Sequence, residues 1–135
     1  MEKSCFKVFA GDVSVDWQTA RQNCQEQSSD LAIVDTEIKR KAMDTRIDKK
    51  DQHLPNVDIQ VFIGILRLGL WQWLGDGHIS ADSWHQGYPL RSPTQHCGFL
   101  QKRSQWKLLQ SQCNFQRSYL CETEESTYIN IIILL

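Results

Sequence analysis

Five cysteines restrict the fold of this chain more than any other feature of its sequence. A chain of 135 residues with five tryptophans and this many cysteines favours an oxidising compartment and a disulfide framework. No Cys-x-x-Cys pair occurs, so the sequence supports neither a zinc knuckle nor a thioredoxin-type redox pair. Because the number is odd, at least one thiol is free or pairs outside this sequence. Counting alone does not choose the bridges, and five buried thiols in a cytosolic protein are the alternative. The cysteines are Cys5, Cys24, Cys97, Cys113 and Cys121.

The charge of the chain is nearly balanced but unevenly distributed. A formal net charge of -1, with 41% hydrophobic and 23% charged residues, is typical of one globular domain and argues against a nucleic-acid partner. Residues 83–121 contain no Asp or Glu and carry a formal +5, so the remainder carries -6. Calcium is held largely by carboxylate oxygens, so this stretch cannot build a calcium cage from its own acids. Its cations are Arg91, Lys102, Arg103, Lys107 and Arg117.

Both ends of the chain suggest a piece of a larger protein. Residues 1–11 contain no hydrophobic signal run, so we expect any secretion signal to lie upstream of Met1. Residues 128–135 are apolar but shorter than the about 20 residues that span a bilayer. We therefore divide the chain into a domain at 1–123 and a tail at 124–135. The tail is a truncated linker, the start of a membrane segment, or a terminal strand.

Hydrophobic periodicity predicts two helices followed mostly by strands. The first helix, 17–27, is capped by Asp16. The second is capped by Asp35 or Thr36 and runs to Lys50, with Ile38, Ala42 and Met43 inward and Lys39, Arg40 and Lys41 largely solvated. Residues 75–95 read as a long irregular loop, of the kind that is often functional. The order of elements predicts an α+β fold with an antiparallel sheet. Strands are expected at 4–10, 31–34, 57–66, 96–101, 105–110 and 117–122.

Several short motifs, from about Cys5 to Glu122, together resemble the C-type lectin-like domain family. Each motif is weak alone, but their joint order and spacing is specific. The resemblance implies two helices packed on antiparallel sheets, a long irregular loop and disulfide staples. The motifs are Trp17-x-x-Ala20-x-x-x-Cys24, Leu31-Ala32, Phe62-Ile63-Gly64-Ile65, Trp71-Gln72-Trp73 with Asp76-Gly77, His96-Cys97-Gly98, and Tyr119-x-Cys121-Glu122.

The resemblance also implies how the cysteines pair. It joins Cys24 to Cys121 and Cys97 to Cys113. Cys5 matches the second cysteine of an extra N-terminal hairpin in longer members of the family, whose partner would lie upstream. Cys5 is therefore orphaned or forms an intermolecular bridge, which leaves a covalent dimer open.

The calcium motifs of sugar-binding members are degenerate in this sequence. Where the resemblance implies a Glu-Pro-Asn or Gln-Pro-Asp triplet, the chain has Tyr88-Pro89-Leu90. Where it implies Trp-Asn-Asp, the chain has Trp106-Lys107-Leu108, seven residues before Cys113 instead of the more common five. Just before Cys97, where the resemblance often implies an acid, the chain has Gln95 and His96. These side chains offer calcium too few oxygens, so we expect no metal and no calcium-dependent sugar binding.

The basic, aromatic-bearing segment of the second half is the predicted ligand-binding face. Arginine and aromatic side chains anchor many interfaces, and clustered cations favour anionic partners. The alternative is that the tryptophans pack in the core and the cations are only solvated. The predicted contact residues are Trp84, Tyr88, Arg91, Lys102, Arg103 and Lys107.

These observations predict an extracellular, calcium-independent recognition module whose ligand is a protein. The alternatives are a calcium-independent lectin for anionic glycans and a structural spacer domain of a larger membrane receptor. The chain has no Gly-x-Ser-x-Gly elbow, no His-Glu-x-x-His and no phosphate-binding glycine loop. We therefore expect no enzymatic activity and no cofactor.

Overall fold

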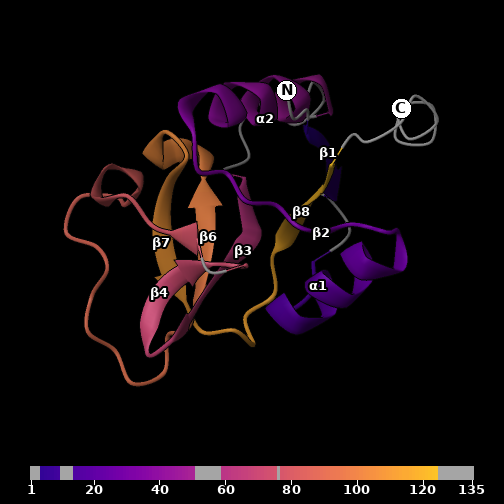
Figure 1. Ribbon diagram of the computed structural model, residues 1–135. Coiled ribbons are helices and arrows are strands. Elements are labelled where there is room, and N and C mark those ends of the chain that lie inside the picture. Colours follow the sequence, from indigo (N-terminus) through magenta and orange to yellow (C-terminus); the bar gives the residue numbers. More distant parts are fainter. Residues whose placement is uncertain (1–3, 10–13, 51–58, 76, 125–135) are drawn as a thin grey trace.

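The computed structural model describes residues 4–9, 14–50, 59–75 and 77–124, and the side chains of residues 14–47, 59–75 and 77–123. In this part of the chain two helices, α1 (Trp17–Glu26) and α2 (Glu37–Lys50), lie against an eight-stranded sheet (Figure 1). Two short 3-10 turns, η1 (Ala81–Ser83) and η2 (Lys102–Ser104), interrupt the second half. The strands are β1 (Ser4–Phe9), β2 (Asp30–Leu31), β3 (Gln60–Leu68), β4 (Leu70–Trp73), β5 (Gly77–His78), β6 (Cys97–Gln101), β7 (Lys107–Ser111) and β8 (Ser118–Glu124).

The sheet branches at β3. Its main path runs β1-β8-β3-β4-β5, while β6 pairs with both β3 and β7, and β2 pairs with β8. The first and last described strands meet, since β1 pairs antiparallel with β8 from Ser4↔Glu124 to Phe9↔Tyr119. The predicted α+β class is confirmed. One addition is that β3 and β8 run parallel, so the sheet is mixed.

Helix α1 follows directly from its sequence. Asp16 Oδ1 accepts a hydrogen bond from the Thr19 N–H at 2.8 Å, which satisfies one of the free donors of the first turn. Trp17, Ala20 and Cys24 face the core, as their spacing predicts. The indole N–H of Trp17 donates to the Ile63 carbonyl at 3.0 Å and so fixes the helix to β3.

Helix α2 is rotated relative to the prediction. Thr36 provides its cap, because its hydroxyl accepts from the Lys39 N–H. Ile38, predicted inward, is 81% exposed, and Ala42 is exposed too, so both predictions were wrong. Met43 is buried as predicted, and Ile47 is buried with it.

The rotation turns predicted surface cations toward the protein. The Lys39 ammonium lies 2.8 Å from the Glu122 carboxylate and also donates to the Ile33 carbonyl. The Arg40 side chain is only 16% exposed. These polar contacts join α2 to β8 and the preceding loop, a pairing that the apolar pattern of the helix alone does not reveal.

Strand β3 is buried on both faces. Successive side chains of a strand point to opposite faces, so Val61, Ile63 and Ile65 join the cluster with Met43 and Ile47 of α2. Phe62 points to the opposite face and joins the second cluster, which contains the buried residues of α1. This double burial explains the continuous apolar run in the sequence.

Gly64 allows a close approach between β3 and the segment after β2. A Cβ at this position would lie 2.8 Å from the Leu31 carbonyl oxygen, and the Gly64 N–H donates to the Ala32 carbonyl at 2.7 Å. No residue with a side chain fits there without moving the backbone. Of the predicted 31–34 strand, only Leu31 lies in β2, which begins one residue earlier at Asp30 and pairs with β8.

The predicted long loop has more structure than its composition indicates. It contains β5 and η1, and Trp84 forms a bridge with Leu108 and packs edge-to-face on Trp71 at 5.2 Å between ring centres. The irregular part is the stretch after Trp84, up to β6.

No described helix combines the length and apolarity needed to cross a membrane. Residues 51–58, which include the start of the predicted 57–66 strand, Asp76 and tail residues 125–135 lie outside the described residues.

Candidate functional site

Two disulfides hold the ends of the domain and the base of the long loop. Cys24 of α1 bonds to Cys121 of β8, and Cys97 of β6 bonds to Cys113. These are the pairs that the resemblance implies. Cys5 lies in β1, whose side chains are not among those described, so the proposal of a bridge through Cys5 stays a prediction.

The amide side chain of Gln110 joins the long loop to the sheet at two points. Gln110 of β7 accepts a hydrogen bond from the Leu90 N–H through Oε1, and its Nε2 donates to the Leu90 carbonyl at 2.9 Å. The same nitrogen donates to Gln95 Oε1, also at 2.9 Å. Gln110 is 5% exposed, so three contacts of a buried amide connect β7 to two points of the loop.

The resemblance to sugar-binding C-type lectins implies that their calcium motif would lie at this position. Counting back five residues from Cys113 gives Leu108-Leu109-Gln110, two residues further along than Trp106-Lys107-Leu108. Gln110 is thus the residue that faces the Tyr88-Pro89-Leu90 segment, whose Tyr88-Pro89 bond is cis.

The donor set at this position does not fit calcium. The ion takes about six to eight oxygen ligands, several of them charged. Leu90 and Leu109 have no side-chain oxygen, and the carboxamides of Gln95 and Gln110 are neutral and bonded to each other. Among the described residues, no three His, Cys, Asp or Glu side chains form a group that could hold a metal ion.

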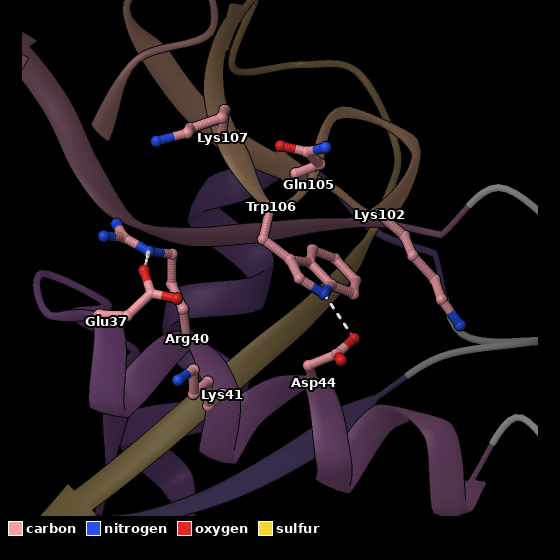
Figure 2. Close-up of a pocket in the computed structure, with 8 residues that line it drawn as sticks. All are labelled: Glu37, Arg40, Lys41, Asp44, Lys102, Gln105, Trp106 and Lys107. Carbon is pink, nitrogen blue, oxygen red and sulfur yellow. Dashed lines mark hydrogen bonds and ion pairs between the residues drawn. The ribbon is translucent and has the colours of Figure 1, made fainter. Parts of the chain in front are cut away.

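A basic groove lies on another part of the surface, between α2 and the turn that joins β6 to β7. Figure 2 shows its first part, with the Trp106 indole reaching down to α2. Two adjoining hollows, of about 440 and 820 Å³, form this groove. The first is lined by Glu37, Arg40, Lys41, Asp44, Lys102, Gln105, Trp106 and Lys107. The second is lined by Glu37, Arg40, Ala81, Asp82, Trp84, His85, Gln86, Arg103, Ser104, Gln105 and Lys107.

The wall formed by the β6–β7 turn has an unusual backbone. Gln105 and Trp106 are consecutive left-handed residues, each with φ 58°. This conformation costs about 1–3 kcal/mol per non-glycine residue and persists only where surrounding contacts impose it. Here the Trp106 N–H donates to the Gln101 carbonyl at 3.0 Å, and its indole N–H donates to Asp44 Oδ1 at 2.7 Å.

The groove acids are largely engaged by the protein itself. Asp44 accepts the Trp106 indole N–H, and Glu37 lies 3.2 Å from Arg40 Nε. Lys107 Nζ donates to the backbone carbonyl of Asp82 at 2.6 Å, which holds its ammonium over the groove. The lining counts five cations (Arg40, Lys41, Lys102, Arg103, Lys107) against three acids (Glu37, Asp44, Asp82), a net +2.

The structure separates the predicted contact residues into two groups. Trp84, Lys102, Arg103 and Lys107 line the groove. Tyr88 and Arg91 belong to the long loop and line neither hollow; the Tyr88 ring packs edge-to-face on His85 at 5.9 Å.

Sequence reasoning missed the α2 wall of the groove. Arg40 and Lys41 belong to the half of the chain with the net acidic charge, and that sum concealed them. The local signal was present, because residues 39–41 are three consecutive cations on a helix. Their closeness to residues 102–107 depends on packing between segments about sixty residues apart in sequence.

The helix pair, mixed sheet, two disulfides and long loop define a recognition domain of C-type lectin-like fold. A family model described as "Lectin C-type domain" matches residues 13–123, and the chain belongs to this family. It is 28% identical over 120 residues to "Salivary C-type lectin 1" of Aedes albopictus, covering 82% of this chain and 78% of that one.

Solved structures share the fold at lower identity. Human lithostathine has a TM-score of 0.74 and 21% identity, over 90% of this chain and 83% of its own. A calcium-independent type II antifreeze protein has a TM-score of 0.69 and 18% identity, over 89% of this chain and 85% of its own. At these identities the likeness shows the fold alone.

Proposed function

We propose that this chain is an extracellular recognition domain that binds its ligand without calcium, and that it is not an enzyme. The observation that carries the proposal is the Gln110 amide. Its hydrogen bonds to Leu90 and Gln95 link β7 to the long loop, a link that a bound ion would otherwise have to provide. Calcium is therefore not needed to hold the long loop.

Two further observations support calcium-free function and an extracellular location. The calcium-independent antifreeze protein has the same fold, so this architecture is compatible with calcium-free function. Two disulfides and a salivary lectin as relative favour an oxidising, extracellular location.

The basic groove is the binding site that we propose. Its five cations select an anionic ligand. A protein with an acidic surface, expected from the sequence, and an anionic glycan both meet this requirement. Apart from Ala81, Trp84 and the largely buried Trp106, the lining is polar or charged. This favours the glycan, because protein interfaces usually need an apolar pocket for an anchoring side chain. A spacer domain would bind neither.

The test is a ligand screen in two buffers. The disulfide-bonded domain is applied to immobilised anionic and neutral glycans and to acidic proteins, once with millimolar calcium and once with a chelator. We expect binding of anionic ligands to be the same in both buffers. Binding only with calcium would overturn the calcium-free proposal, and no binding in either buffer would favour a spacer.

A further inference from the structure

We infer that the groove between α2 and the β6–β7 turn binds a linear sulfated glycan, with Arg40 of α2 as the residue that selects sulfate. The inference rests on the proposed calcium-free binding and adds the ligand class and the selecting residue. It concerns a surface distinct from the position where Gln110 meets the long loop.

The shape of the groove favours a linear ligand. The two hollows share Glu37, Arg40, Gln105 and Lys107, so they are neighbouring parts of one depression. A compact small molecule would occupy one hollow. A chain can run from Lys102 in the first hollow to Arg103 and Gln86 in the second, and so contact both.

The cations occur on both walls. Arg40 and Lys41 come from α2, whereas Lys102, Arg103 and Lys107 come from the turn and the start of β7. A chain with a negative group on each repeating unit would meet cations on either side along the groove. Two of the three groove acids already have partners in the protein, which limits their repulsion of an anionic ligand. The Trp106 indole N–H donates to Asp44, and Glu37 is paired with Arg40.

The groove floor disfavours a peptide. Trp106 is 6% exposed, so its ring packs into the protein and offers little surface for an apolar anchor. Apart from Ala81 and Trp84, the remaining lining is polar, including Gln86, Ser104 and Gln105, which can bond ring hydroxyls and sulfates. An acidic peptide would bury few apolar atoms here and would depend on charge alone.

Arg40 has the geometry of a sulfate-selecting residue. It lines both hollows, and its Nε donates to Glu37 at 3.2 Å. In Figure 2 the two terminal nitrogens of the guanidinium point away from Glu37. A planar pair of donors can hold two oxygens of one anion, which the ammonium of a lysine cannot do. Because the side chain is 16% exposed and paired, it is already oriented.

The experiment measures binding by titration calorimetry in the presence of a chelator. The probes are size-defined heparin oligosaccharides, the same oligosaccharides after chemical desulfation, and poly-glutamate. The variants are Arg40→Gln, Arg40→Lys and Lys107→Gln. Arg91→Gln is the matched control, because it removes one exposed cation that lines neither hollow.

We expect heparin oligosaccharides to bind the native domain and the desulfated form to bind at least about tenfold more weakly. Arg40→Gln and Lys107→Gln should each weaken binding by about fivefold and lower the slope of log Kd against log salt by about one, as for cations that contact other linear polyanions. Arg40→Lys should keep the salt slope but lose affinity, and Arg91→Gln should change neither. A thermal melt confirms that each variant is folded.

Three results would overturn the inference, and they differ from failure of the proposed function. Equal binding of poly-glutamate and heparin would refute the ligand class. Loss of binding in Arg91→Gln but not in Arg40→Gln or Lys107→Gln would refute the groove. Equal affinity of Arg40→Lys and the native protein would refute sulfate selection. In each case binding without calcium would remain; the proposed function itself would be overturned by a requirement for calcium or by the absence of any binding in either buffer.

Discussion

The guanidinium carbon of Arg117 lies 3.9 Å from the centre of the Phe99 ring, just before β8 begins. The rings of Phe62 and Phe115 lie at 5.4 and 5.3 Å from the same carbon. Burial lowers the pKa of Arg117 to about 10, so the side chain remains charged at neutral pH. This cation therefore has aromatic rings as close neighbours, and belongs to the sheet and not to the basic groove.

We predict that Arg117→Ala destabilises the domain by about 2–3 kcal/mol, because it removes packing and leaves the partners of the guanidinium unbonded. Those partners are Gln60 Oε1 at 3.0 Å and Ser111 Oγ at 2.6 Å. Arg117→Met keeps most of the packing but loses the same hydrogen bonds, so it should cost about 1 kcal/mol less than Arg117→Ala. Urea denaturation measures the free energy of unfolding of both variants. An equal cost for the two variants would show that the polar contacts of the guanidinium, and not its packing, dominate at this position.

Asp16 should make stability depend on pH in acid. Hydrogen bonds from Thr19 lower the pKa of Asp16 below its ordinary value, so the folded state binds its proton less readily than the unfolded state. This stabilisation is present above the unfolded pKa of 3.8 and is lost as pH falls through the lowered folded pKa.

The Asp16→Asn variant tests this dependence, because asparagine caps about as well but does not titrate. We expect its stability to match that of the native protein near neutral pH and to fall less in acid. Asp16→Ala should cost about 1 kcal/mol near neutral pH. If the free energy of unfolding of the native and Asp16→Asn proteins falls equally in acid, Asp16 is not the source of the pH dependence.

The sequence predicts the fold well because its determinants are local. A cap such as Asp16 and the apolar run of β3 each act over a few residues and leave a visible pattern. The cysteine pairing is not local. It became predictable only through the family resemblance, since parity left the bridges open.

The site was less predictable, because it depends on which face of α2 meets the sheet. An apolar pattern places Ile38 inward, but Lys39 bonds to Glu122 and turns the helix the other way. That ion pair joins residues 83 positions apart, and no short-range pattern encodes it. Arg40 reaches the groove as a result.

Gln110 should act as an ion-free link between β7 and the long loop. Gln110→Ala removes three hydrogen bonds of a buried amide, so we expect a loss of about 1–3 kcal/mol. Added calcium should not restore the stability. A thermal melt with and without calcium gives both results.

A gain-of-function variant provides the control for this link. Replacement of Tyr88 by Glu, Leu90 by Asn, Leu109 by Asn and Gln110 by Asp supplies the oxygens that the native position lacks. We expect calcium to raise the Tm of this variant and leave that of the native domain unchanged. A calcium-dependent rise in the native domain would show that the native donor set does bind the ion.

Gln105 offers a test of whether the strained turn serves binding. Its left-handed backbone suits glycine, so Gln105→Gly should stabilise the domain by up to about 1 kcal/mol. Ser104→Gly, in η2 and without positive φ, should destabilise it by about 0.5–1 kcal/mol and serves as the control. If the Gln105 carboxamide contacts a ligand in both hollows, the glycine variant will be more stable but will bind heparin oligosaccharides more weakly. An increase in stability with unchanged affinity would mean that the turn only orients Trp106, whose indole N–H bonds to Asp44.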